Sequence, residues 1–190
     1  MFWPTASLAA KLSSMTDPTP EFPTHWKRPN DCTVREREIF EEMVIAGGEV
    51  DPVGLTGRIL DAERLVFCRS GELIVGVAGL KKPSARHRKD VSDDAGVPLP
   101  TDELPLEFGW AFVCPGARKR GISGKLLASI LEGIECGVFA TSRANNEAIH
   151  AAMKKAGFSQ EGKIHLSRRA HKSPMALFVR PSYSRPELSV

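Results

Sequence analysis

The chain has 190 residues, of which 42% are hydrophobic and 26% charged, and this ordinary composition excludes wholesale disorder, collagen and a coiled coil. The net charge of +3, from 26 basic and 23 acidic residues, is too small to demand a polyanionic partner. No apolar run reaches the roughly eighteen residues that span a bilayer, so no membrane partner is expected.

The cysteines, Cys32, Cys68, Cys114 and Cys136, lie far apart in the sequence and form no C-x-x-C pair. This spacing predicts neither a metal site nor a disulfide framework. The first residues lack the basic region and the uninterrupted apolar region of a secretory signal. We therefore expect a cytoplasmic protein with reduced thiols.

Residues 1–31 hold five of the fourteen prolines and show no apolar period, so we expect a leader or mobile arm there. The folded domain is expected over residues 32–182. It opens with a capping box at Thr33 and Glu36. An apolar helical stripe follows and ends at Gly47.

Asp51 and Pro52 are typical of the cap and first turn of a second helix. Two β-rich runs, 65–69 and 72–80, are joined by a Ser-Gly turn and predict a hairpin. Residues 81–104 are polar with balanced charges, and we expect a loop that is either solvated or turned toward a substrate.

The second half of the domain alternates strands and helices. The elements expected, in order, are a strand at 106–113, a helix from Ile122 to Ile134, a strand at 137–142, a helix capped by Asn145 or Asn146 and closed by Gly157, and strands at 163–168 and 175–180. Residues 183–190 are expected to form an exposed tail.

The most informative segment runs from Val113 to Leu127, where a strand ends, glycines turn the chain and a helix begins. Free N–H groups at that helix start and the helix dipole favour an anion, and Gly121 and Gly124 allow the backbone to approach it closely. Four cations with no acid among them surround the turn: Arg118, Lys119, Arg120 and Lys125. The segment is predicted to cradle a phosphate, although it is neither a Walker A loop nor G-x-G-x-x-G.

This segment resembles the acetyl-CoA loop of the GNAT N-acetyltransferase superfamily, [RQ]-x-x-G-x-[GA], read here from Arg118 through Gly121 to Ser123. Ser123 stands where the family has glycine or alanine. The strand at 106–113 precedes the loop at the family's spacing. Residues 146–158 resemble the family's second block, which ends in K-x-G-F.

The resemblance implies an α/β fold, a mixed and mostly antiparallel twisted sheet flanked by helices, with acetyl-CoA as co-substrate. The CoA pyrophosphate would lie on the backbone N–H groups of one loop, formed by Arg118, Lys119, Arg120, Gly121, Ile122, Ser123 and Gly124. The pantetheine arm would lie in a splayed strand pair, against Phe112 and Val113 on one side and residues 138–142 on the other. Asn146 would contact CoA, or serve only as a helix cap.

Glu107 is the candidate catalytic base, because acetyl transfer to an amine needs a neutral nitrogen and the family often keeps a glutamate on this strand. Next to Phe108 and Trp110, desolvation would raise its pKa; the alternative is a salt bridge at the edge of a strand. Met153 occupies the position of the family's usual tyrosine acid. His150, one turn earlier on the same helix, is the candidate substitute, or is merely exposed.

The resulting hypothesis is an N-acetyltransferase that moves an acetyl group to a small-molecule or peptide amine by direct attack. An acyl-CoA sensor without chemistry is the alternative, motivated by Met153. A polyanion binder using the basic loop and the cluster at 168–172 is less favoured, because few aromatic residues lie near those cations to stack on nucleic-acid bases. Cys114 is expected to be a buried structural thiol rather than a covalent acetyl carrier. A homodimer remains open.

Overall fold

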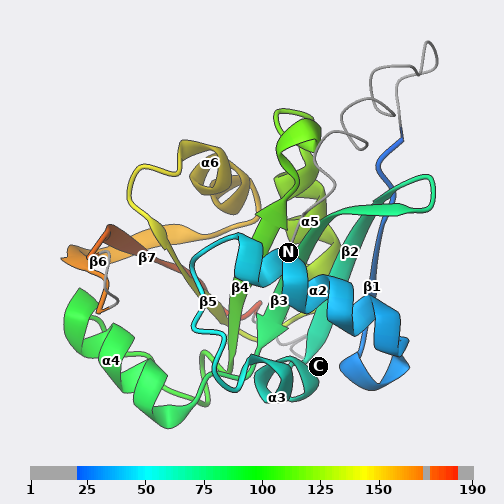
Figure 1. The fold of residues 1–190 in the computed structure, drawn as a ribbon. Helices are drawn as coiled ribbons and strands as arrows, with labels where there is room; N and C mark the ends of the chain where they lie inside the picture. Colours follow the sequence, from blue (N-terminus) through cyan, green and yellow to red (C-terminus); the bar gives the residue numbers. More distant parts are fainter. Residues whose placement is uncertain (1–20, 169–171, 184–190) are drawn as a thin grey trace, which may run out of the picture.

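The computed structural model describes residues 21–168 and 172–183 of the chain, and these form one sheet with helices on both faces (Figure 1). The sheet order is β1-β2-β3-β4-β5-β7-β6. The strands are β1 (Thr24–Lys27), β2 (Arg64–Ser70), β3 (Leu73–Lys81), β4 (Leu106–Val113), β5 (Val138–Arg143), β6 (Ser159–Leu166) and β7 (Pro174–Arg180). The helices are η1 (Pro29–Asp31), α2 (Val34–Ala46), α3 (Leu55–Leu60), α4 (Ala85–Ala95), η2 (Pro115–Ala117), α5 (Ile122–Leu131) and α6 (Glu147–Lys155).

All neighbouring strands are antiparallel except β4 and β5, which run parallel. This confirms the expected mixed, mostly antiparallel sheet flanked by helices. None of the helices in the described residues is long and apolar enough to cross a membrane.

The first strand corrects the expectation that residues 1–31 form a leader or mobile arm. Residues 24–27 form β1 and pair with β2 at the edge of the sheet, and Phe22 just before it is buried. The short strand lacks clear apolar alternation because all four of its residues are half-buried. The rest of the expected arm, residues 1–20, lies outside the described residues, as does residue 184 onward of the expected tail.

The start of α2 confirms the capping box. The Thr33 hydroxyl accepts from the Glu36 N–H at 3.1 Å, and the Glu36 carboxylate accepts from the Thr33 N–H at 2.9 Å. The second helix differs from expectation: Asp51 accepts a hydrogen bond from the N–H of Val53 in a turn, and α3 begins only after Gly54, whose φ is +68°.

Helices α2 and α5 cover opposite faces of the sheet, with α2 in front and α5 behind in Figure 1. The apolar face expected for α5 is buried: Ile122, Leu126 and Leu127 are at most 2% exposed. The sheet and these two helices therefore share one main core around β2, β3 and β4.

The prediction of a loop over the polar segment 81–104 is wrong, because the segment contains α4. Ser84 caps the start of this helix, and the helix ends at Gly96. Only Val91 and Ala95 give its buried face apolar character, so no apolar stripe marks the helix. The third buried residue is Arg88, whose guanidinium donates to the carbonyls of Leu99, Leu104 and Pro105. These bonds hold α4 against the part of the sheet formed by β5, β7 and β6. Arg168, which follows β6, pairs with Asp90 and Asp94 of α4.

Candidate functional site

The sheet opens between β4 and β5. The two strands pair only from Leu106 opposite Val138 to Phe108 opposite Ala140, although β4 continues to Val113 and β5 to Arg143. Beyond Phe108, the edge of β4 that faces β5 has no strand partner, while its other edge stays paired with β3. The splayed strand pair predicted from the sequence is therefore present, and Phe112 and Val113 lie in its open part, half-buried.

A bulge in β4 lies beside this opening. Opposite β3 the register shifts between Val77 and Gly79, and Trp110 takes a φ of +54°. Such a backbone costs an ordinary residue about 1–2 kcal/mol. The Trp110 ring compensates by packing over Gly79, where a Cβ would lie 2.5 Å from it, and edge-on against Phe40.

Helix α5 begins at the end of the opening with a turn built for close backbone approach. Lys119 and Gly121 have φ values of +63° and +72°, and no side chain of the described residues caps the helix. Ile122 is buried and anchors the first turn, while Gly121 is exposed. Within the described residues no side chain accepts from the N–H groups of that turn, and together with the helix dipole such a turn can bind an anion.

Around this turn, Arg118, Lys119 and Arg120 are exposed, and Ser123 is half-buried. Arg118 Nε donates to the carbonyl of Val113 at 3.1 Å, which ties the turn to the end of β4. Gly124 faces Ala152 of α6, where an added Cβ would lie 4.0 Å from its Cβ. The residues predicted for the cofactor loop are therefore brought together at one place.

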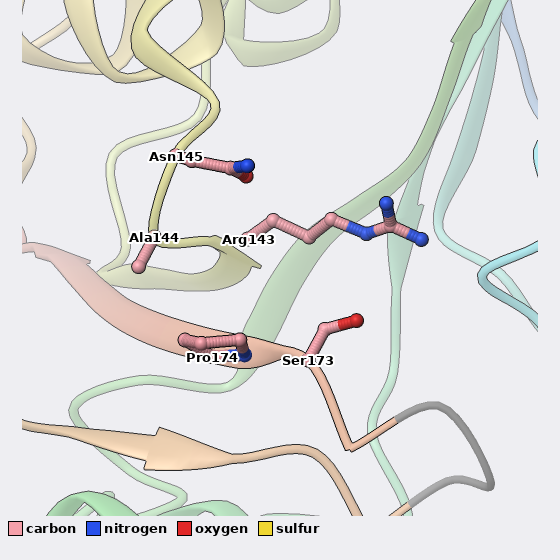
Figure 2. A pocket seen from close by; sticks show the side chains of 5 residues that line it. All are labelled: Arg143, Ala144, Asn145, Ser173 and Pro174. Atoms are coloured by element: carbon pink, nitrogen blue, oxygen red, sulfur yellow. The ribbon is translucent and has the colours of Figure 1, made fainter.

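Asn146 acts as the cap of α6, because its Oδ1 accepts from the N–H of Ile149 at 3.4 Å. Its neighbour Asn145 instead lines a cavity of about 300 Å³ at the end of β5. Figure 2 shows the Asn145 amide, the Arg143 guanidinium and the Ser173 hydroxyl extending toward the same side. Arg143 also pairs with Glu49. This polar cavity adjoins the open end of the splayed strands.

Glu107 lies just before the opening, with its side chain 3% exposed. Lys81 Nζ of β3 is 2.7 Å from one carboxylate oxygen, and His87 Nε2 of α4 is 3.0 Å from the other. Burial alone would raise the pKa of Glu107, but the charge of Lys81 and the contact with His87 lower it to about 2. The raised pKa expected from the sequence is therefore wrong, because partners from two other elements keep the carboxylate ionised.

Lys81 and Glu107 are direct neighbours across β3 and β4. The end of the Lys81 side chain lies over Gly109, where a Cβ would be 2.9 Å from Lys81 Cε and 3.0 Å from its Nζ. The alternative expected for Glu107, a salt bridge, is thus present, although it lies within the sheet and not at its edge.

A cavity of about 970 Å³ lies against this cluster. Its wall combines the ends of β3 and β4, α3, η1 and the start of α4; the residues are Arg28, Pro29, Asn30, Arg58, Leu60, Asp61, Ala62, Glu63, Lys81, Lys82, Pro83, Ser84, His87, Glu107 and Trp110. Charges of both signs and one indole line it. The sequence identified Glu107 but missed Lys81 and His87, since no local pattern joins a strand end and a polar helix to β4.

The remaining candidates lie elsewhere. His150 stacks at a tilt on Phe178 of β7, with ring centroids 4.5 Å apart, and its Nε2 is buried without a partner among the described residues. It does not line the cavity at Glu107. Met153 is 2% exposed in the main core. Cys114 is 3% exposed, and burial raises the pKa of its thiol, which suits a structural cysteine.

The basic cluster expected at 168–172 is described only in part. Arg168 is taken up by Asp90 and Asp94, which raises its pKa. Residues 169–171 lie outside the described residues. The paired Arg168 favours a solvated hairpin tip over a polyanion site.

No protein-family model matches the sequence, and a search of curated proteins gave no match. Solved structures do resemble the chain. An acyl-CoA N-acyltransferase from Pseudomonas aeruginosa aligns with a TM-score of 0.61 at 15% identity, covering 84% of this chain and 99% of its own. The ribosomal-protein-S18-alanine N-acetyltransferase from Escherichia coli aligns with a TM-score of 0.61 at 12% identity. The alignment covers 88% of this chain and 100% of the acetyltransferase.

A third structure is a GNAT superfamily phosphinothricin acetyltransferase from Sinorhizobium meliloti in complex with AcCoA. Its TM-score is 0.58 at 16% identity, with 89% of this chain and 95% of its own covered. These alignments span nearly the whole length of each neighbour. The chain therefore has the fold of the GNAT acetyltransferases.

Proposed function

We propose that the protein is an acetyl-CoA-dependent N-acetyltransferase. The observation that carries the proposal is the opening of the sheet immediately after Glu107 and Phe108, with an uncapped helix start at one end and a large cavity beside it. A long cofactor with a diphosphate can lie in the opening, and a second substrate can enter from the cavity. The two would meet next to Glu107.

The cofactor's diphosphate would lie on the free N–H groups at Gly121, Ile122 and Ser123, with Arg118, Lys119 and Arg120 as nearby cations. Its pantetheine arm would pair with the unpartnered edge of β4 at Phe112 and Val113. Acetyl-CoA itself supplies the activated thioester. This chain's backbone N–H groups near the bulge would polarise the thioester carbonyl.

The acceptor would be an amine on a small molecule or peptide, held in the cavity between α3, η1 and α4. Direct attack requires the ammonium to lose a proton first. The attack of the amine on the thioester then becomes effectively intramolecular, because both reactants are bound side by side. Asp61 lines this cavity and could face a cationic acceptor, whereas Glu63 is paired with Lys82.

The test is a screen of amines with acetyl-CoA that measures free CoA thiol and the acetylated product together. We expect amine-dependent thiol release by the full chain. Binding of acetyl-CoA without release for any amine would favour the sensor on the same fold. If the chain neither binds acetyl-CoA nor releases thiol, the transferase and the sensor are both refuted.

A further inference from the structure

The cluster around Glu107 contains His87 of α4, which lies within the polar segment 81–104 that the sequence predicts as a loop. The His87 ring lines the cavity, is 43% exposed, and directs Nε2 at Glu107 Oε2 from 3.0 Å. The other oxygen of Glu107 is taken by Lys81 at 2.7 Å. A buried carboxylate thus joins a strand lysine to a half-exposed imidazole on the wall of the acceptor cavity.

We infer that His87 is the group that takes the proton from the acceptor amine, and that Glu107 is a positioning residue for it. This rests on the acetyl transfer proposed above. The geometry assigns the roles: the Glu107 side chain is 3% exposed and both its oxygens are contacted, by Lys81 and His87, whereas the 43% exposed His87 ring reaches the space where an amine would bind. An ionised carboxylate accepts from an N–H, so Nε2 carries the proton and Nδ1 is left as the acceptor.

The contact between His87 and Glu107 has the distance of an ion pair but lacks the alignment of a hydrogen bond. Such contacts in active sites without substrate commonly tighten when substrate binds. The backbone around His87 is firmly held: its N–H donates to the Ser84 hydroxyl at 3.2 Å, and the adjacent Arg88 is fixed by three carbonyls. The imidazole is therefore presented by a rigid element.

Acetyl transfer moves one proton of the acceptor to His87 and a second to the CoA sulfur. Nδ1 of neutral His87 takes one proton from the ammonium, and the freed lone pair forms a C–N bond with the acetyl carbonyl carbon. The C–S bond then breaks, and its electron pair leaves with the CoA sulfur. The second proton lost by the nitrogen goes to that thiolate, and His87 releases its own proton to solvent. Glu107 stabilises the imidazolium in between.

Several charged groups lie around His87. Glu107 from β4 contacts its Nε2, and Lys81 from β3 contacts the other oxygen of the same carboxylate. Lys82, which pairs with Glu63 at 3.1 Å, stands in the same cavity wall. The remaining charged groups around the cavity are Arg28, Arg58 and Asp61.

The kinetic test compares His87→Gln with His165→Gln, a matched histidine of β6 outside the cavity. With an amine found by the screen, His87→Gln should lower kcat by about 100-fold or more, the contribution of a general base. It should also remove the low-pH limb of the kcat profile and leave acetyl-CoA affinity unchanged. His165→Gln should match the wild type. Imidazole added to His87→Ala should restore part of the rate.

A second readout needs no acceptor. Nitrogen-15 spectra of the imidazoles in the free protein should show His87 protonated at Nε2 and bare at Nδ1. The double variant Glu107→Gln/Lys81→Met, which leaves no unpaired charge, should lose that tautomer preference. A proton on Nδ1 in the wild type, or kcat of His87→Gln within twofold of the wild type, would overturn the assignment while the transferase stands. No transfer by the wild type to any amine would overturn both.

Discussion

At the scale of single residues, two glycines leave room for the Lys81–Glu107 ion pair and for the strained Trp110 on the neighbouring strands β3 and β4. Gly79 makes room for the Trp110 ring, and Gly109 makes room for Lys81. The two side chains that lie over these glycines, Trp110 and Lys81, both line the cavity. The shape of the cavity wall at Glu107 therefore depends on residues that carry no functional group.

Gly109→Ala should push the end of Lys81 aside, because the new Cβ would lie 2.9 Å from Lys81 Cε. The lysine end is flexible, so its ion pair with Glu107 should be weakened rather than lost, and the fold should be destabilised by about 1 kcal/mol. Urea unfolding measures this. Gly57→Ala is the control, since its Cβ meets nothing within 4 Å in α3 and should stabilise by about 0.5–1 kcal/mol. Equal effects of the two variants would contradict the close approach of Lys81 to Gly109.

Glu36 should make stability depend on acid pH. Burial alone would raise the pKa of its carboxyl, but Lys27 and the Thr33 N–H lower it from 4.5 to about 2. A lowered pKa in the folded state adds stability that is complete above pH 4.5 and is lost as the pH falls toward 2. The loss should be of the order of 3 kcal/mol.

The check is urea unfolding at pH 7 and near pH 2.5 for the wild type, Glu36→Gln and Glu38→Gln. Glu36→Gln should have a smaller pH dependence, because it removes the titrating group. Glu38 is 53% exposed and its one ion pair among the described residues is with Arg35, so Glu38→Gln should behave like the wild type. If Glu36→Gln keeps the full pH dependence, the acid sensitivity originates elsewhere.

At the scale of elements, α5 is bounded by two glycines in the same backbone conformation. Gly121 before it has φ +72° and Gly133 after it has φ +67°, and a Cβ at either position meets nothing within 4 Å. Alanine at either position should cost a similar 1–2 kcal/mol, roughly the cost of a left-handed residue. Only Gly121 lies where the cofactor's diphosphate would bind.

Gly121→Ala should therefore weaken acetyl-CoA binding, by about tenfold for each 1.4 kcal/mol lost from the loop contacts. Gly133→Ala should lose equal stability and bind acetyl-CoA as the wild type does. Thermal melting and calorimetry on both variants separate the two effects. Equal weakening by both would mean that strain alone, and not the loop, lowers the affinity.

The elements that sequence patterns predicted were those with local signals. The capping box of α2, the hairpin at Gly71 and the apolar face of α5 each depend on residues within a few positions of one another. Strand β1 was missed because its pairing with β2 spans about forty residues and its own four residues do not alternate. Helix α4 was missed because its buried face centres on Arg88, whose partners lie in a loop.

In the candidate site, too, the sequence predicts the part with a local signal and misses the part that long-range contacts bring together. The turn at Gly121 could be found because glycines, cations and a helix start follow one another along the chain. The environment of Glu107 could not, because Lys81 reaches it across a strand pair and His87 from a helix that the sequence did not mark. The direction of its pKa shift was therefore predicted wrongly. The bulge at Trp110 likewise depends on space above Gly79, on the neighbouring strand.

At the scale of the whole molecule, one topological feature unites these observations. The only parallel pair of the described sheet, β4 with β5, separates after three residue pairs. The α5 turn meets the opening from one side, and the cavity at Glu107 lies against its start. In the described residues the sheet is otherwise continuous, and the opening lies between two of its own strands.

The most direct test of the account is calorimetric titration of the full chain with acetyl-CoA at low and moderate salt. We expect saturable heat for one site, a raised melting temperature, and competition by CoA. Because the neutral pantetheine arm and backbone N–H groups share in binding, affinity should fall less steeply with salt than that of a polyanion held by the exposed cations alone. The absence of both heat and thermal protection at millimolar acetyl-CoA would contradict the account.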